Sequence, residues 1–244
     1  MIPHWLHLVA LAVLLTGLLS AIVIAFDVAR HPQHMAVMNI VWPVSALYAG
    51  PIALWGYFRY GRLATHEAMM PAIKRGEEPP SKKLTPFPVI VGTGAAHCGA
   101  GCTLGDIIAE WLCFGVPAIA VWFGYQSIFA DKMFAIWIVD FIFAFLIGIG
   151  FQYFAIVPMR DLSFGKGVIA ALKADTLSLT AWQIGMYGFM ALAQFYLFRT
   201  LLGVNLEVNT LEFWFMMQIA MLCGFVTAYP VNWWLIRVGI KEEM

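Results

Sequence analysis

Charged residues are scarce in this sequence. Lysine, arginine, aspartate and glutamate make up 11% of its 244 residues, and the formal net charge is zero. Ordinary soluble domains are about a quarter charged, so this composition excludes a cytosolic enzyme of the usual kind and a disordered chain. The lack of a basic excess also excludes a nucleic-acid binder that relies on positive charge.

Cysteine is scarce as well, whereas apolar residues are abundant. Four cysteines in 244 residues are too few for a disulfide-rich scaffold. Hydrophobic residues make up 62% of the chain, which is more apolar surface than a soluble protein of this size can hide from water. The composition therefore predicts an integral membrane protein whose main partner is the lipid bilayer.

Six apolar segments are long enough to cross a bilayer as helices, which takes about 20 residues each. They predict an all-α, polytopic fold with six transmembrane helices in a single transmembrane domain over residues 1–244. Prolines and charges predict a polar loop over about 60–88, and glycines at 92–101 predict an irregular or re-entrant stretch before the third helix. The six spans are expected at about 5–26, 35–58, 102–125, 133–158, 177–198 and 213–236.

The basic residues orient these spans, because cytoplasmic loops of membrane proteins are enriched in lysine and arginine. If both termini are cytoplasmic, 11 of the 14 basic residues lie inside, including those of the loop over 60–88. Arg30, Lys132 and Arg199 then lie outside. A signal peptide at residues 1–25 is not expected, because no lysine or arginine precedes Arg30.

The most unusual segment combines an imidazole, two thiols and two acids: His97, Cys98, Cys102, Asp106 and Glu110. The last four recur every four residues, so a helix brings them into one row, and an unwound turn at a glycine would add His97. These groups suit Cu(I) or Zn(II) as metal ligands, and acids within a membrane indicate a functional site. In the structural alternative, the cysteines only pack and the glycines allow close helix contact.

A second group of soft ligands lies in the first predicted outer loop. His31, His34, Met35 and Met38 are candidate copper ligands, because thioether sulfur favours Cu(I). The alternative is a solvated turn at the membrane surface. Two further pairs of methionines are each one helical turn apart: Met186 with Met190, and Met217 with Met221. They would line part of a metal path. In the alternative, they only fill gaps in the core.

One further acid lies about two turns inside the fourth predicted span. This residue, Asp140, needs a partner if it is buried in the membrane. Asp106, Glu110 and Asp140 are therefore a candidate path for protons or ions. Asp175 lies just before the fifth predicted span and is a candidate helix cap, with the following hydroxyl residues as alternatives.

Residues 97–106 read HCGAGCTLGD, and this run resembles an uncharacterised family of bacterial membrane proteins that is known as a domain of unknown function. Residues 42–43, 48–51 and 173–178 are similar to the same family. The resemblance implies a multi-pass protein of the bacterial inner membrane. It implies no activity, substrate or site.

Three functions are consistent with the sequence. The leading hypothesis is a membrane protein that binds and translocates a soft metal ion, with Cu(I) preferred over zinc. The first alternative is a proton-coupled secondary transporter or channel without a metal, and the second is a membrane thiol redox protein. Haem is not expected, because only His97 lies clearly deep in a predicted span. An enzyme is less favoured than a transporter, and the formation of a homo-oligomer stays open.

Overall fold

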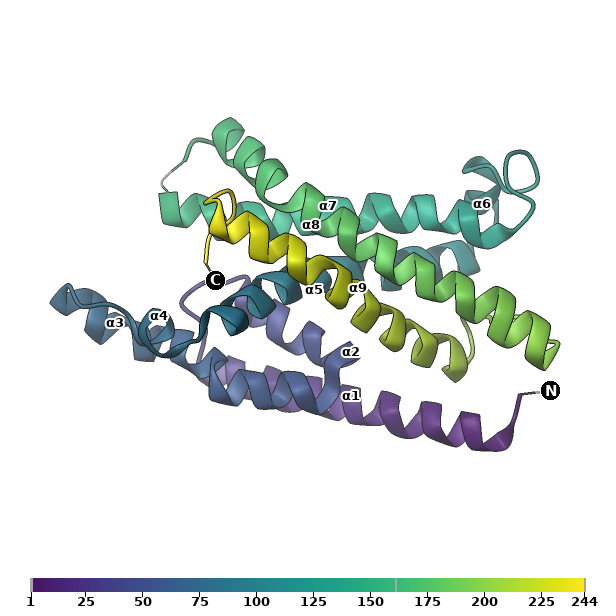
Figure 1. Cartoon of the computed structure of the whole chain (residues 1–244), viewed down its shortest axis with the longest axis horizontal. Helices are drawn as coiled ribbons and strands as arrows, with labels where there is room; N and C mark the ends of the chain where they lie inside the picture. Colours follow the sequence, from purple (N-terminus) through teal and green to yellow (C-terminus); the bar gives the residue numbers. More distant parts are fainter. Residues whose placement is uncertain (1, 161, 244) are drawn as a thin grey trace.

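The structure is a computed structural model that describes residues 2–160 and 162–243, whose regular secondary structure is helical. Within this part of the chain, four helices are long and apolar enough to cross a membrane: α1, α5, α7 over Lys132–Val157, and α9. The predicted all-α fold with several such helices is therefore present. Five long helices form the bundle in Figure 1: α1 (His4–Arg30), α5 (Phe87–Gly115), α7 (Lys132–Arg160), α8 (Phe164–Ala191) and α9 (Leu211–Arg237).

The helix that follows α1 is broken in its middle. α2 (Met38–Arg59) consists of two half-helices that meet at Gly50, where the backbone has φ 50° and ψ −126°. Glycine adopts this conformation far more readily than other residues, and Pro51 follows it directly. Since a helix rises about 1.5 Å per residue, each half is shorter than the roughly 30 Å hydrocarbon core of a bilayer.

Both ends of α2 lie at the same end of the bundle. Ahead of α2, Pro32 O accepts a hydrogen bond from the His66 N–H at 2.8 Å, and the His34 N–H donates to Ala64 O at 2.9 Å. Residues 64–66 follow α2 in the chain, so the segment returns to the place where it entered. Figure 1 shows this reversal beside α1. α2 is thus a re-entrant helical hairpin.

The tip of this hairpin is held at the middle of α1. A Cβ atom added at Gly17 would lie 2.7 Å from Leu47 O, so the glycine makes room for the tip. From α9, the Gln218 side chain donates a hydrogen bond to the same carbonyl oxygen at 2.6 Å. Irregular backbone at membrane depth is tolerated where the protein satisfies its polar groups, and Gln218 does this at the tip.

The base of the hairpin is fixed to the last turns of α1 by an ion pair. Arg62 donates to both carboxylate oxygens of Asp27, at 2.9 and 3.0 Å. Tyr57 donates to the same carboxylate at 2.7 Å. These contacts join the end of α2 to α1 and keep both legs of the hairpin at one end of the bundle.

Two details of the predicted topology are corrected. The segment over 35–58 does not cross the bundle, because it reverses at Gly50. No irregular stretch occurs over 92–101, because α5 is regular helix from Phe87 to Gly115. The glycines there serve helix packing, as the structural alternative proposed: a Cβ at Gly101 would lie 2.7 Å from the Gly148 Cα on α7.

The shorter helices gather at the two ends of the bundle (Figure 1). The α3 end carries η1 (Gly61–Ala64), α3 (His66–Arg75), α4 (Pro80–Leu84) and the C-terminus, so the predicted loop over 60–88 is largely helical. The α6 end carries α6 (Ala118–Trp122) and the N-terminus, and α8 continues toward it as a π-helix, η2 (Leu192–Leu202). The two ends of the described chain therefore lie at opposite ends of the bundle. The six-span prediction places both chain ends on the same side. The structure differs from it because the hairpin takes the place of one predicted crossing.

Candidate functional site

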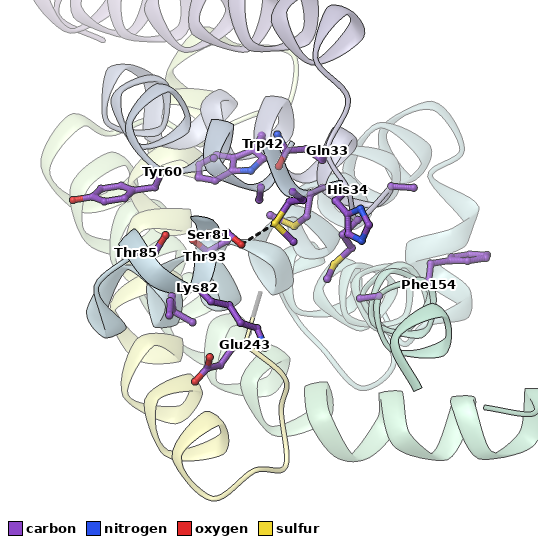
Figure 2. A pocket seen from close by; sticks show the side chains of 18 residues that line it. Gln33, His34, Trp42, Tyr60, Ser81, Lys82, Thr85, Thr93, Phe154 and Glu243 are labelled. Carbon is purple, nitrogen blue, oxygen red and sulfur yellow. Dashed lines mark hydrogen bonds between the residues drawn. The ribbon is translucent and has the colours of Figure 1, made fainter. Parts of the chain in front are cut away.

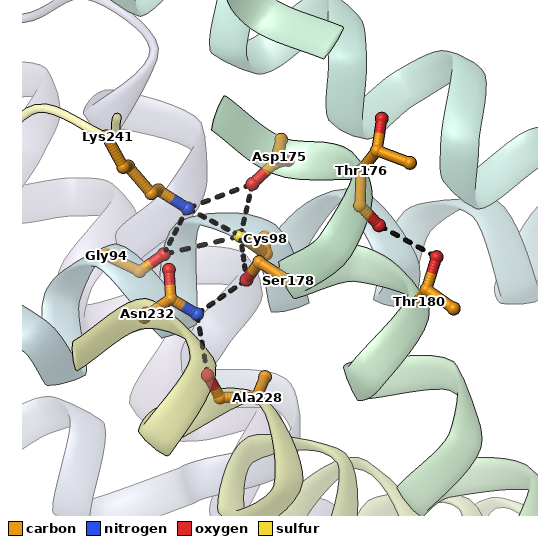
Figure 3. A network of polar contacts seen from close by, with 9 residues as sticks. All are labelled: Gly94, Cys98, Asp175, Thr176, Ser178, Thr180, Ala228, Asn232 and Lys241. Carbon is orange, nitrogen blue, oxygen red and sulfur yellow. Dashed lines mark hydrogen bonds and ion pairs between the residues drawn. The ribbon is translucent and has the colours of Figure 1, made fainter. Parts of the chain in front are cut away.

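A buried polar cluster surrounds Cys98 on α5 (Figure 3). The Cys98 thiol donates a hydrogen bond to Asp175 Oδ1 at 2.5 Å and lies 3.0 Å from Ser178 Oγ; both of these residues belong to α8. The three side chains are fully or almost fully removed from solvent. The cluster therefore joins two central helices through polar contacts in an otherwise apolar interior.

Lys241 supplies the only positive charge in this cluster among the described residues. Its Nζ atom lies 2.9 Å from Asp175 Oδ1, 2.8 Å from Cys98 Sγ and 3.2 Å from Gly94 O. Both side chains of the Lys241–Asp175 ion pair are 0% exposed. Because a buried charge is very costly without a partner, this pair requires both of its members.

The chain beyond α9 turns back to deliver this lysine. We call residues 238–243 the C-terminal tail. Gly239 has φ 72°, a left-handed conformation that suits glycine after a helix end, and the N–H groups of Ile240 and Lys241 both donate to Leu235 O. Burial alone would lower the pKa of Lys241, but Asp175 and Cys98 raise it above its ordinary value. The amine therefore keeps its proton.

An asparagine of α9 extends the cluster. Asn232 donates to Ser178 Oγ at 2.5 Å and to Ala228 O at 2.9 Å. Two oxygens here, Asn232 Oδ1 and Asp175 Oδ2, have no hydrogen-bond partner within residues 2–160 and 162–243. The cluster thus holds more acceptors than the described donors use.

The acids Asp106, Glu110 and Asp140 lie elsewhere in the bundle and are 0%, 4% and 1% exposed. Gln183 of α8 donates a hydrogen bond to Asp106 Oδ1 at 3.4 Å. As far as the chain is described, Asp106 Oδ2 and both carboxyl oxygens of Asp140 have no hydrogen-bond partner. The three acids are close enough to interact electrostatically. This is the grouping that the sequence predicted as a proton or ion path.

Two cavities reach these acids from different directions. A cavity of about 250 Å³ is lined by Asp106 together with Tyr48, Thr103 and Gln218. A second cavity, of about 270 Å³, is lined by Glu110 and by charged residues of the α6 end: Asp131, Lys132, Arg199 and Glu207. Asp106 therefore borders a cavity between α1, α5 and α9, and Glu110 borders one at the α6 end, whereas Asp140 lines neither.

The predicted metal ligands on α5 are not gathered at one point. His97 is buried with its ring centroid 6.1 Å from that of Phe151, and neither ring nitrogen has a hydrogen-bond partner in the described chain. Because α5 is not unwound at its glycines, His97 points about 100° away from Cys98 around the helix. Within residues 2–160 and 162–243, no three His, Cys, Asp or Glu side chains form a metal-binding group.

Three of the four loop ligands predicted for copper do share a cavity. His34, Met35 and Met38 line a cavity of about 430 Å³ beside α2, and Met69 of α3 joins them (Figure 2). His31 instead contacts Glu67 at 3.3 Å. The cavity lies at the α3 end, together with the basic loop and the C-terminus, and not at the opposite end as the six-span topology placed it.

The methionines predicted to line a path are buried in the main hydrophobic core. Two of them, Met217 and Met221, also line the cavity at Asp106, and Met190 lines the cavity at Glu110. Thr103 donates a hydrogen bond to the Met221 sulfur at 3.6 Å. Met186 is 1% exposed and lines neither of these two cavities. The four side chains therefore border the acid region without forming a thioether cluster of their own.

Sequence reasoning missed the partners of Cys98. From the sequence, Lys241 is one basic residue near the C-terminus, and Asp175 is a candidate helix cap. In the structure α8 begins at Phe164 after Ser163, so Asp175 lies three turns inside the helix and faces Cys98. One sequence feature could have indicated the cluster: Asp175 and Ser178 are three residues apart, so their acid and hydroxyl groups share one helix face.

The fold and these polar groups define an α-helical protein with several helices fit to cross a membrane and a charged, buried interior. Its residues 90–241 match the family described as "Domain of unknown function (DUF4396)". The match covers more than half of the chain, so the chain belongs to this family. It includes the buried acids and extends to Lys241. Comparisons with curated proteins and with solved structures find no similar protein.

Breaking the buried ion pair should destabilise the protein. Lys241→Met leaves the Asp175 charge without a cation, and Asp175→Asn leaves the ammonium without an anion. Each change should lower the free energy of unfolding by about 3–5 kcal/mol. The double variant Lys241→Met/Asp175→Asn should recover much of this loss, because it buries no charge.

Thermal unfolding in detergent micelles measures these differences. Lys166→Met is the matched control, because Lys166 is an exposed lysine on α8 and its removal should change stability by less than about 0.5 kcal/mol. Single variants that unfold at the wild-type temperature would show that the pair does not stabilise the bundle.

Proposed function

We propose that the chain is a membrane protein that moves protons, alone or coupled to another solute, through Asp106, Glu110 and Asp140. The observation that carries this proposal is the burial of three acids, two of which, Asp106 and Asp140, have carboxyl oxygens without a hydrogen-bond partner among the described residues. Intramembrane acids of this kind mark proton and ion paths in pumps and transporters. The proposal corresponds to a proton-coupled transporter or channel.

The energetics of burial support protons as the carried species. An ionised carboxylate in an apolar interior is very costly unless a cation or several hydrogen bonds compensate it. Asp140 has neither among the described residues, so it is most stable when it holds a proton. Asp106 and Glu110 each border a cavity, through which such an acid can release and regain a proton.

The placement of the acids supports a direction for the path. Glu110 meets the charged cavity at the α6 end, and Asp106 lies one helical turn further along α5 and meets the cavity between α1, α5 and α9. Gln183 contacts Asp106 from α8 and can both donate and accept hydrogen bonds. Cys102 and Cys98 continue the same row toward the α3 end.

Basic residues support the orientation of this path in the membrane. We propose five crossings, by α1, α5, α7, α8 with η2, and α9, with the α3 end in the cytoplasm and the N-terminus outside. In this arrangement 12 of the 14 basic residues are cytoplasmic, and only Lys132 and Arg199 lie outside. This division satisfies the positive-inside rule better than six spans do. The resemblance of residues 97–106 supports a bacterial inner membrane as the location.

Neutralising the acids should abolish proton movement. In proteoliposomes with an imposed membrane potential, Asp106→Asn, Glu110→Gln and Asp140→Asn should each lose most of the proton flux that an internal pH-sensitive dye reports. Each path residue must hold and release a proton, which an amide cannot do. Infrared spectra of the Asp variants should also lack part of the protonated-carboxyl band.

The control for this series is Glu77→Gln, which changes an exposed acid of the loop after α3 and should leave the flux at its wild-type level. Wild-type flux in all three path variants would refute the proton path.

Single cysteines should report the orientation. In a variant without native cysteines, His4→Cys should react with a membrane-impermeant maleimide only from outside the cell, and Arg30→Cys only in inverted vesicles. The six-span topology expects the opposite result at both positions, because it places the N-terminus inside and Arg30 outside. Gln126→Cys, in the loop at the α6 end, serves as an external control in either arrangement.

Binding and transport of Cu(I) is the second candidate function. The observation that favours it is the shared cavity of Met35, Met38, Met69 and His34, because thioethers and imidazole are ligands that Cu(I) accepts. A soft metal captured there would lie at the same end of the bundle as Cys98. Thiol redox chemistry at Cys98 and Cys102 stays a prediction.

Copper loading should depend on the cavity methionines. The protein in detergent is loaded with Cu(I) under reducing conditions, and mass spectrometry measures the stoichiometry. Met35→Leu/Met38→Leu/Met69→Leu should lose the bound copper, since leucine keeps the volume of methionine but offers no sulfur.

Met186→Leu/Met190→Leu should retain the copper, as the matched control from the core. Cys98→Ala/Cys102→Ala tests the site predicted from the sequence. Equal loading in the triple methionine variant and the wild type would exclude the cavity as the copper site.

A further inference from the structure

The amino group of Lys241 is a cation enclosed by acceptors that the helix bundle supplies. A lysine ammonium has three N–H donors, and three acceptors lie around Nζ: Asp175 Oδ1, Cys98 Sγ and Gly94 O (Figure 3). The acceptors come from α5 and α8. The tail contributes only the cation, so these two helices make the site without it.

The site holds more acceptor capacity than Lys241 uses. Asp175 Oδ2 and Asn232 Oδ1 are buried next to it and have no hydrogen-bond partner among residues 2–160 and 162–243. A buried oxygen without a donor is costly. The surplus of acceptors over donors is therefore what a binding site for a cation requires, and a structural ion pair alone does not explain it.

The segment that brings the cation is well suited to move away. In the C-terminal tail, Gly239 has a left-handed backbone conformation two residues beyond the end of α9. Val238 and Ile240 are 50% and 41% exposed, so little apolar contact holds the tail. Outward movement of the tail breaks the buried Lys241–Asp175 ion pair, so it becomes favourable when another cation takes the place of the lysine head.

An open space lies next to the tail. Glu243 and Thr93 both line the 430 Å³ cavity at the α3 end (Figure 2), and Thr93 directly precedes Gly94 in α5. The tail therefore lies between this cavity and the cluster around Cys98.

We propose that the three acceptors around Lys241 form a site for a small primary ammonium ion, which the C-terminal tail plugs with its own amino group. An external ammonium has the same charge and the same N–H donors as the lysine head, so it competes with the tail. A quaternary ammonium of similar charge does not, because it has no N–H group. This site uses none of Asp106, Glu110 and Asp140, so it does not depend on the proposed proton path.

Chemical rescue tests the site. In Lys241→Ala, methylammonium chloride should raise the unfolding temperature in a saturable way, because the ion fills the vacated site. Tetramethylammonium chloride at the same ionic strength should give no such rise. The wild type should show no difference between the two salts, since its site is already filled. Equal effects of the two salts on Lys241→Ala would overturn the proposal.

The reactivity of Cys98 tests the plug. In a protein with Cys102, Cys113 and Cys223 replaced by alanine, Lys241→Ala should raise the rate of N-ethylmaleimide labelling by about tenfold or more, because labelling of a buried group follows the free energy of local opening. Methylammonium should slow the labelling again. Glu243→Gln, a tail change outside the cluster, should leave the rate unchanged.

A charge-neutral variant keeps the test decisive if Lys241→Ala does not fold. Lys241→Met/Asp175→Asn buries no charge and lacks both the plug and the carboxylate. It should label faster than the protein with an intact tail, and methylammonium should not protect it. Labelling as slow as with the intact tail, or full protection by methylammonium, would refute the proposal.

Discussion

The close approach of α5 to its neighbours is the constraint on which the interior depends. Gly99 leaves room for the Trp182 ring of α8, Gly105 lies against the backbone of Ala144, and Gly101 lies against that of Gly148. A side chain at any of these positions would push the helices apart, and interfaces of small residues are a common way for membrane helices to pack. Because this packing excludes lipid and water, every polar side chain on these faces must find a protein partner or stay neutral.

The re-entrant hairpin follows from a related requirement. A half-length helix leaves backbone carbonyls unsatisfied at its tip, and lipid offers them no donor. Gly17 allows the tip to reach α1, and Gln218 supplies the missing donor from α9. The hairpin thus depends on the helix that precedes it and on α9, which lies far from it in the sequence. In return, it fills half of the depth beside α1, and the cavity with His34 and Met35 opens at its base.

The sequence predicts the class of the fold because long apolar segments have few alternatives to a membrane helix. It predicts the burial of Asp106, Glu110 and Asp140 for the same reason. It does not predict the hairpin, since the 22 residues of α2 have the length of a crossing and their reversal depends on one backbone conformation at Gly50. Nor does it predict the role of Lys241, whose partners Asp175 and Cys98 lie 66 and 143 residues away. In the sequence, Lys241 is followed by two glutamates, a pattern typical of a solvated segment. Only the fold shows that its side chain is buried.

One face of α5 therefore carries two electrostatic environments. Near Cys98, a cation is present and Asp175 can remain charged at full burial. Two turns further along the same row, Asp106 has an amide as its described partner, so burial favours its protonated form. This separation is required by the proposed proton path, because a lysine next to Asp106 would hold that carboxyl ionised and prevent it from carrying a proton. In the proposed proton path, the placement of the Lys241 cation at the α3 end leaves the acids of the α6 half able to exchange their protons.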